Sequence, residues 1–337
     1  MPDILEIGEH RIPRGSRVRL EIPVAQLSTG TQVAMPVQVI RSRKAGPVVF
    51  ISAAIHGDEL NGVEIIRRLI AKAPTITSGS VILVPMVNVF GVHSLSRYTP
   101  DRRDLNRTFP GSEKGSLAGR LAHIFMNEIV NQCDYGIDLH TGAIHRSNLP
   151  QIRANLKDDE TRRLAEAFGV PVILNSELRD GSLRQIAAEQ GTRILLYEAG
   201  EALRFDELSI RAGVKGVQNV LAALGMMRKR SRRNLPEPFA ANKSNWVRAP
   251  VSGIVRDLKR LGDWVDKGEA LAEIGDPYGD VTATLCANRS GVIIGQQNIP
   301  LVQEGDAMYH IAAFDEEDTE ALTDSIELMQ DTLLPDV

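Results

Sequence analysis

The stretch Pro47-Val-Val-Phe-Ile-Ser-Ala-Ala-Ile-His-Gly-Asp-Glu59 decides the fold, because it joins an apolar run to a short polar turn. Residues 47–55 are apolar at nearly every position, which is typical of a strand buried on both faces of a parallel sheet. Residues 62–72 follow with apolar side chains at helical spacing. The sequence therefore predicts a strand–turn–helix unit with His56 and Glu59 on the turn.

His56 and Glu59 are three residues apart where the predicted strand passes into the helix. In open α/β sheets, ligands bind at the carboxyl ends of the strands. An imidazole and a carboxylate on such a turn can reach the same divalent cation. A catalytic zinc site commonly takes two His and one Glu and leaves one position open. We therefore expect a second histidine from elsewhere in the chain.

His140 is the best candidate for this second histidine. It ends the predicted strand 134–140, and the small residues Thr141 and Gly142 follow it. Other histidines, such as His123 and His310, lie on a predicted helix or strand, where a structural role is more common. The sequence thus predicts a metal site formed by His56, Glu59 and His140. Asp58 is expected to contact one of the ligating histidines.

Strand and helix patterns alternate from residue 47 to residue 225, which predicts an α/β domain with a mixed, largely parallel sheet flanked by helices. Residues 1–45 contain two alternating segments around a turn, and we expect an antiparallel hairpin at one sheet edge. Residues 1–227 are expected to form this first domain, which carries the predicted metal site. Residues 88–113 and 143–155 show no clear period and are expected to be loops.

The C-terminal third has a different pattern. Residues 228–245 begin with a basic, proline-containing run and are expected to be a linker. Residues 246–314 read as short strands separated by glycines, which predicts a small all-β domain. This domain resembles the biotinyl/lipoyl-type barrel-sandwich fold, but it lacks a modifiable lysine in the hairpin position. Residues 315–337 are acidic and are expected to form a tail or a frayed helix.

Composition excludes several classes of protein. The chain of 337 residues is 43% hydrophobic and 24% charged, as in ordinary soluble globular proteins. Its net charge of −4 gives no general attraction to nucleic acid or anionic membranes. Cys133 and Cys286 are expected to be buried thiols. There is no apolar run of about 18 residues and no basic leader, so we expect a cytoplasmic protein without a membrane partner.

Glu198 and a group of arginines are further candidates for the site. Glu198 is late in a predicted buried strand, where a carboxylate is costly unless it is paired or functional. It is expected to be either a general base toward a metal-bound water or a salt-bridged structural residue. Four arginines in the loop 88–113 could bind a carboxylate or stabilise an oxyanion, although aspartates nearby offer them local partners. These arginines are Arg97, Arg102, Arg103 and Arg107.

Four features together resemble the succinylglutamate desuccinylase/aspartoacylase family, a branch of the zinc carboxypeptidase-like enzymes. They are the His-x-x-Glu motif at 56–59, Asp104-Leu-Asn-Arg107, the strand-end His140 and the late-strand Glu198. The resemblance covers roughly residues 45–225. The appended β domain is similar to that of the family as well.

The resemblance implies one zinc ion per chain, held by His56, Glu59 and His140. It also implies that Glu198 activates a water molecule and then protonates the leaving amine. Asn106 and Arg107 would bind the carboxylate of an acylated amino acid.

The family also uses an upstream arginine to polarise the scissile carbonyl group. The loop in this sequence is longer than the family pattern, so Arg97, Arg102 and Arg103 compete for the role. Arg102 is the preferred candidate of the three.

We therefore expect a zinc-dependent amidohydrolase that cleaves a small N-acyl amino acid or a related N-acyl amine to a carboxylate and a free amine. One alternative is a zinc carboxypeptidase acting on a small peptide, in which Arg107 holds the C-terminal carboxylate. Another is a metal- or ligand-binding relative without catalysis. The acyl group is not determined by the sequence. Exposed sheet edges would allow a homo-oligomer.

Overall fold

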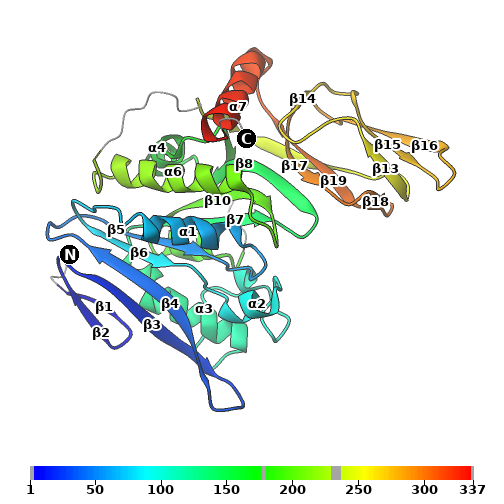
Figure 1. The fold of residues 1–337 in the computed structure, drawn as a ribbon. Coiled ribbons are helices and arrows are strands. Elements are labelled where there is room, and N and C mark those ends of the chain that lie inside the picture. The colour runs from blue at the N-terminus through cyan, green and yellow to red at the C-terminus, as the bar shows by residue number, and fades with distance from the viewer. Residues whose placement is uncertain (1–3, 177–179, 229–236, 335–337) are drawn as a thin grey trace.

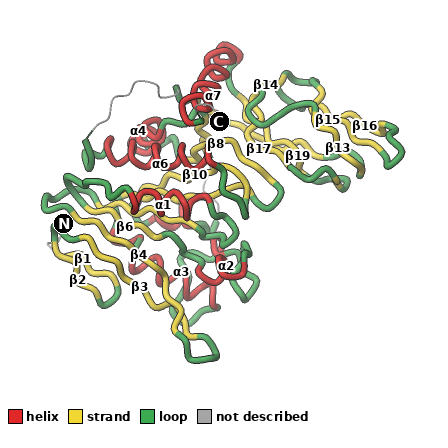
Figure 2. The backbone as a smooth tube through the Cα atoms, in the orientation of Figure 1, coloured by secondary structure: helices red, strands yellow, loops and turns green. Residues whose placement is uncertain are grey.

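A computed structural model of the chain describes residues 4–176, 180–228 and 237–334 (Figure 1). Its main feature is a mixed sheet with 13 strands among these residues. The main path runs in the order β12-β19-β17-β8-β10-β7-β5-β6-β4-β3. Figure 2 shows the strands crossing the molecule with helices on both sides of the sheet. The predicted α/β fold class is confirmed.

The centre of the sheet is parallel and consists of the apolar segments recognised in the sequence. Parallel pairing joins β6 to β5, β5 to β7, and β7 to β10. The bounds are β5 (Val48–Ala53), β6 (Ser80–Val84), β7 (Tyr135–Gly142) and β10 (Arg193–Glu201). Every residue of β5 and β6 is buried, as expected for strands covered by helices on both faces.

Helices cover both faces of the sheet, and the sheet separates two hydrophobic cores. One core packs the sheet against α1 (Asn61–Ala71), α4 (Asp159–Phe168) and α6 (Glu207–Ala223). The other packs it against α3 (Leu117–Glu128) and α5 (Leu183–Glu189). Most of these helices are capped at their first turn by a side chain that accepts a hydrogen bond from a backbone N–H group. The caps are Ser116, Asp158, Ser182 and Asp206.

The N-terminal segment contains two hairpins. The hairpin expected within residues 1–45 corresponds to β3 (Arg17–Gln26) and β4 (Gln32–Arg41), and β4 pairs with β6 at the sheet edge. A second, two-stranded sheet is formed by β1 (Ile4–Ile7) and β2 (His10–Pro13). These strands have four residues each, which is too short for a clear period in the sequence.

Two segments expected to be loops contain regular structure. Residues 143–155 hold β8 (Arg146–Ala154), which pairs antiparallel with β10. The expectation of a loop was wrong here because Pro150 and several polar residues hide the strand pattern. Residues 88–113 contain α2 (Val89–Ser94) and a 3-10 turn at Leu105–Arg107.

The C-terminal strands continue the central sheet. Strand β17 pairs antiparallel with β8, and β19 and β12 follow it. A separate sheet has the order β16-β15-β13-β18. The bounds are β11 (Phe239–Ala241), β12 (Lys243–Arg248), β13 (Gly253–Asp257), β14 (Trp264–Val265), β15 (Ala270–Gly275), β16 (Val281–Cys286), β17 (Gly291–Gln297), β18 (Leu301–Val302) and β19 (Ala307–Ala313). β9 (Val172–Asn175) joins β8 to β11.

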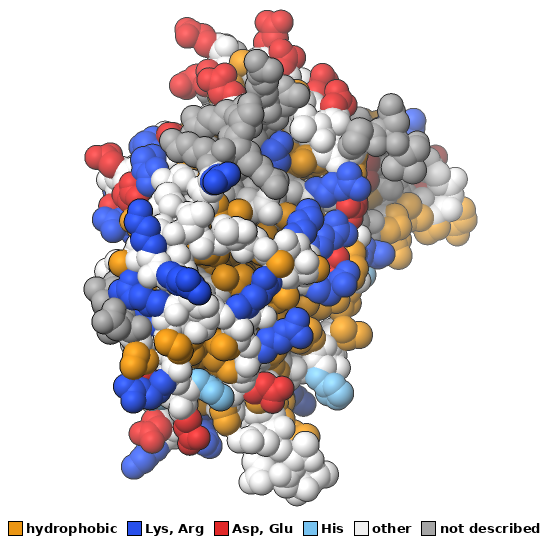
Figure 3. Space-filling model, turned by 60° about the vertical axis from the view of Figure 1, so that its left-hand side comes forward, with side chains coloured by type: hydrophobic (Ala, Val, Ile, Leu, Met, Phe, Trp, Pro, Cys, Tyr) orange, Lys and Arg blue, Asp and Glu red, His pale blue; other side chains and the backbone are white. Residues whose placement is uncertain are grey.

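The segments expected to be a linker and a tail contain strands and a helix in their described parts. Of the segment 228–245, residues 229–236 lie outside the described residues, and most of the described remainder belongs to β11 and β12. Residues 319–333 form α7 (Thr319–Leu333), which buries Leu322, Ile326 and Met329. In Figure 3, acidic side chains gather at the top of the molecule, where Figure 1 places α7. Residues 237–334 therefore contain regular structure that packs against the rest of the fold.

Two smaller expectations concern the cysteines and the membrane. Cys133 is buried as expected, but Cys286 is exposed on β16. Among the described residues, no helix has the length and apolar character needed to cross a membrane.

Gly57 allows the turn after β5 to pack against α2. A Cβ atom at this position would lie 1.9 Å from the carbonyl carbon of Gly91. This contact leaves no space for a side chain. The close approach of the two backbones fixes the position of the turn that carries His56 and Glu59.

Candidate metal centre and substrate cavity

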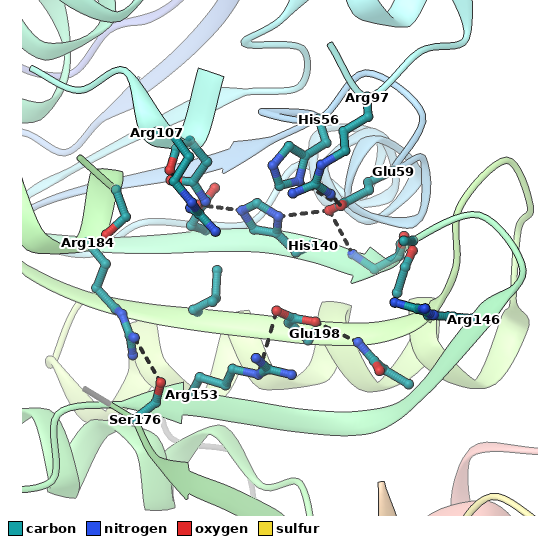
Figure 4. A pocket seen from close by; sticks show the side chains of 18 of the residues that line it. His56, Glu59, Arg97, Arg107, His140, Arg146, Arg153, Ser176, Arg184 and Glu198 are labelled. Carbon is teal, nitrogen blue, oxygen red and sulfur yellow. Dashed lines mark hydrogen bonds and ion pairs between the residues drawn. The ribbon is translucent and has the colours of Figure 1, made fainter. Parts of the chain in front are cut away.

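The structure brings together the three residues expected to bind a metal. One ligand atom from each of His56, Glu59 and His140 lies within 4.8 Å of the others, and all three residues are buried. Nδ1 of His56 is 2.6 Å from Oε1 of Glu59, and Nδ1 of His140 is 2.8 Å from Oε2 of Glu59. Figure 4 shows both imidazoles directed toward the Glu59 carboxylate. The donor set is two nitrogens and one carboxylate.

Strand order explains why residues so far apart in sequence meet. β5 and β7 are parallel neighbours, and Ala53 is in register with Leu139. Both strands therefore end at the same edge of the sheet. The turn after β5 supplies His56 and Glu59, while β7 supplies His140. This is the ligand-binding edge expected of an open α/β sheet.

Each imidazole has a carboxylate on the side away from Glu59. Nε2 of His140 is 2.8 Å from Oδ2 of Asp138, and Nε2 of His56 is 3.1 Å from Oδ1 of Asp104. The Ser52 hydroxyl donates to Asp138 across 2.8 Å. Carboxylates that hold ligating histidines in this way fix the ring orientation and strengthen metal binding.

Asp58 does not have the position expected from the sequence. Its Oδ1 atom is buried and has no hydrogen-bond partner within the described residues. The carboxylates that contact the two histidines are those of Asp138 and Asp104. Asp138 is two residues before His140 on the same strand, so both side chains point to the same face. That spacing of two was the signal in the sequence that could have identified it.

The charged groups of the cluster shift one another's pKa values because they are buried and in contact. Burial alone would raise the pKa of the Glu59 carboxyl, but the charges of His56 and His140 and their hydrogen bonds lower it overall. Burial alone would lower the pKa of His140, but the charges of Asp138 and Glu59 raise it well above its ordinary value. Three carboxylates, those of Glu59, Asp138 and Asp104, therefore surround the two imidazoles and favour positive charge at this site.

Replacing Asp138 with asparagine is expected to weaken metal binding about 10- to 100-fold. Asparagine keeps the shape of the side chain but removes the charge that orients His140. The dissociation constant of zinc, measured by competition with a chromophoric chelator, checks this result. Ser52→Ala removes only the hydrogen bond to Asp138 and should have a smaller effect. An unchanged zinc affinity in Asp138→Asn would contradict the role of this carboxylate.

Glu198 lies one strand away from the metal ligands. β10 and β7 are parallel, and Glu198 is in register with His140. Neighbouring residues in register project from the same face of a sheet, and in Figure 4 Glu198 faces the cavity beside His140. Nδ2 of Asn148 donates to Oε2 of Glu198 across 2.6 Å, and Nε of Arg153 lies 3.6 Å from Oε1. The carboxylate is therefore held in place and reaches the cavity.

A cavity of ≈ 250 Å³ opens over the cluster and is lined by arginines. Those lining it are Arg97, Arg107, Arg146, Arg153 and Arg184. Asn106, Asn148, Glu198 and Trp246 also line it. Three of these arginines were not predicted from the sequence. Arg146 and Arg153 are on β8, which was expected to be a loop, and Arg184 is on α5. Trp246 was missed because it comes from the C-terminal strands.

The arginines of the loop 88–113 have different positions. Arg97 lines the cavity, donates to Oε1 of Glu59 across 3.2 Å and to Oδ2 of Asp104 across 2.9 Å. Arg102 and Arg103 are exposed and are not among the cavity residues in the described part of the chain. The preference for Arg102 in the sequence analysis is thus not supported, because its side chain projects from the loop toward solvent. Asn106 and Arg107 do line the cavity.

Similar proteins share both the sequence pattern and the fold. The family model described as the succinylglutamate desuccinylase/aspartoacylase catalytic domain matches residues 45–224. The chain is 29% identical over 308 residues to an N-alpha-acetyl-L-2,4-diaminobutyric acid deacetylase of Halomonas elongata. That alignment covers 87% of this chain and 90% of the relative.

Solved structures cover nearly the whole chain. The product-bound ectoine utilization protein EutE (DoeB) of Ruegeria pomeroyi superposes with a TM-score of 0.79 at 25% identity, covering 90% of this chain and 97% of that chain. A succinylglutamate desuccinylase/aspartoacylase of Rhodobacter sphaeroides gives a TM-score of 0.77 at 25% identity, covering 89% and 96%. The similarity therefore includes the C-terminal strands.

Proposed function

The chain belongs to the succinylglutamate desuccinylase/aspartoacylase family and is a metal-dependent amidohydrolase that deacylates N-acyl amino compounds, and on this premise we propose that its metal is zinc. The substrate proposed here is a small N-acyl amino acid. The observation that carries the proposal is the buried His–Glu–His cluster with Glu198 in register beside it. The donor set of two imidazoles and one carboxylate is that of catalytic zinc sites.

When bound, zinc lowers the pKa of a water molecule to about 7 and polarises a carbonyl group. Glu198 is the proposed general base, which accepts a proton from the attacking water and delivers it to the leaving amine. Its hydrogen bond from Asn148 orients the carboxylate without blocking both oxygens. Asp138 and Asp104 hold the imidazoles of His140 and His56 in the required orientation.

Arg97 is proposed to stabilise the negative charge that develops on the scissile carbonyl oxygen. A guanidinium group has five N–H donors, and the contacts of Arg97 with Glu59 and Asp104 use two of its nitrogens. Donors remain for a substrate in the cavity that Arg97 lines. Asn106 and Arg107 are proposed to bind the carboxylate of the amino acid, since a guanidinium fork matches a carboxylate.

Hydrolysis of a panel of amides, with metal analysis of the same sample, tests the proposed function. We expect turnover of at least one N-acetyl, N-formyl or N-succinyl amino acid, about one zinc per chain, and loss of activity after chelation. Zinc should restore this activity. Faster cleavage of dipeptides than of any N-acyl amino acid would instead indicate a carboxypeptidase. A full complement of metal without cleavage of any amide would indicate a binding protein.

A further inference from the structure

The separate C-terminal sheet has one buried face and one face that carries exposed apolar side chains. Its order is β16-β15-β13-β18, and in Figure 1 these strands form the right-hand end of the molecule, away from the labelled helices. Ile274, Leu285 and Val302 belong to a hydrophobic core on the buried face. Successive residues of a strand point to opposite faces of a sheet. The residues next to these three along the strands therefore point outward.

Four residues in register form an apolar row across the outward face. Gly275 pairs with Val281 on one side and with Ile254 on the other, and Ile254 pairs with Leu301. Val281 is 57% exposed, Ile254 44% and Leu301 61%. Gly275 has no side chain, so the row has a gap beside Ile254. Contiguous exposed apolar side chains commonly mark a surface that contacts another molecule.

A charged pair lies beside the apolar row on the same face. Arg256 is two residues after Ile254, and Glu273 is two residues before Gly275, so both side chains point outward. The two residues are in register, and Nη1 of Arg256 lies 3.2 Å from Oε2 of Glu273. The Arg256 side chain is 78% exposed, so its other N–H donors are accessible to a partner. One cation and one anion thus occupy neighbouring strands.

The outward face is complementary to a copy of itself. A two-fold axis parallel to the strands and between β13 and β15 places β13 of one copy over β15 of its partner. Arg256 then faces the partner subunit's Glu273, so unlike charges meet. Ile254 faces the partner subunit's Gly275, where the missing side chain leaves space for it. Two sheets packed face to face commonly keep their strands within about 30° of each other, so this aligned arrangement is an ordinary one.

We propose that this face is the contact surface of a homodimer, in which the outward faces of two copies pack against each other. The same axis places β18 over β16, so Leu301 faces the partner subunit's Val281. Each contact then occurs twice, as in every isologous interface. A face of four short strands is smaller than a standard interface, and we expect a dissociation constant of about 1–100 µM. The proposal does not depend on the catalytic function.

Sedimentation velocity of the full chain over a range of concentrations tests the dimer. The wild type should pass from monomer to dimer in the micromolar range. Ile254→Asp places a charge in the apolar row and should raise the dissociation constant about 10-fold or more. Because Ile254 is exposed, this variant should keep the melting temperature of the wild-type monomer. A wild type that remains monomeric at about 1 mM would overturn the proposal and assign the apolar row to a different partner.

Two charge reversals test the proposed position of β13 over β15. Arg256→Glu places two carboxylates opposite each other in its homodimer, and Glu273→Arg places two guanidinium groups opposite each other. Each variant alone should dimerise about 10-fold or more weakly than the wild type, since like charges across an interface repel. An equimolar mixture of the two variants should regain the wild-type affinity, because both contacts between residues 256 and 273 in the mixed dimer then join unlike charges.

Arg120→Glu is the matched control for the change of charge. Arg120 is an exposed residue of α3, and this helix lies well apart from the C-terminal sheet in Figure 1. Its replacement should leave the dissociation constant of the dimer unchanged. Wild-type affinity in both Arg256→Glu and Glu273→Arg would show that the copies meet through another surface and would overturn the proposal. A mixture of these two variants that associates no more tightly than either variant alone would overturn it as well.

Discussion

Replacing Glu198 with glutamine is expected to lower kcat about 100- to 10,000-fold while the metal stays bound, because a general base contributes a factor of that size. Glutamine has the same length and can still accept the hydrogen bond from Asn148. It cannot accept a proton from water. The His–Glu–His cluster does not include Glu198, so the metal content should remain near one per chain. Steady-state kinetics and metal analysis of one preparation check both results.

Glu166→Gln is the control for this experiment. Glu166 is an exposed residue of α4, far along the chain from the cluster, and its replacement should leave kcat unchanged. A Glu198→Gln variant with wild-type kcat would remove this residue from the mechanism. Loss of metal in the same variant would instead assign Glu198 a role in holding the site together.

The His140→Ala variant is expected to lose both the metal and activity. Removing this imidazole leaves one nitrogen and one carboxylate for the ion, and it leaves the buried Asp138 carboxylate with the Ser52 hydroxyl but without the imidazole. We expect less than about one tenth of the wild-type zinc content after dialysis, since three protein ligands are the usual minimum for a catalytic site. A ligand that binds the folded state raises its stability, so zinc should raise the melting temperature of the wild type but not of the variant.

His123→Ala is the matched histidine control. The described contact of the His123 side chain is with Asn127 on the same helix, away from the cluster. This variant should bind zinc and show the same zinc-dependent shift of the melting temperature as the wild type. If His140→Ala retained a full equivalent of zinc, the cluster would not be the metal site.

The sequence could predict those helices and strands whose hydrophobic pattern is clear within the segment itself. Strand β5 is a buried apolar run, and α1 has a clear amphipathic period, so the unit that carries His56 and Glu59 could be located. His140 could be found because it ends a similar run. The meeting of these residues follows from parallel strands that end at one edge.

The parts that could not be predicted depend on tertiary contacts. β8 carries polar side chains on its cavity face, so its sequence resembles a loop, although Asn148 and Arg153 both support Glu198. The choice between Arg97 and Arg102 depends on how the loop folds over Glu59, and sequence spacing carries no information on that. The carboxylate of Asp104 reaches His56 through the same loop.

The pairing of β8 with β17 links the C-terminal strands to the residue that orients Glu198. Gly295 is in register with Asn148, and a Cβ at residue 295 would lie 3.1 Å from Oδ1 of Asn148. A larger residue there would press on the amide that orients Glu198. The matched family segment 45–224 ends well before this glycine. In a chimera that joins this catalytic half to a relative's last strands, any residue other than glycine opposite Asn148 is therefore expected to shift the Asn148 amide and, with it, the Glu198 carboxylate.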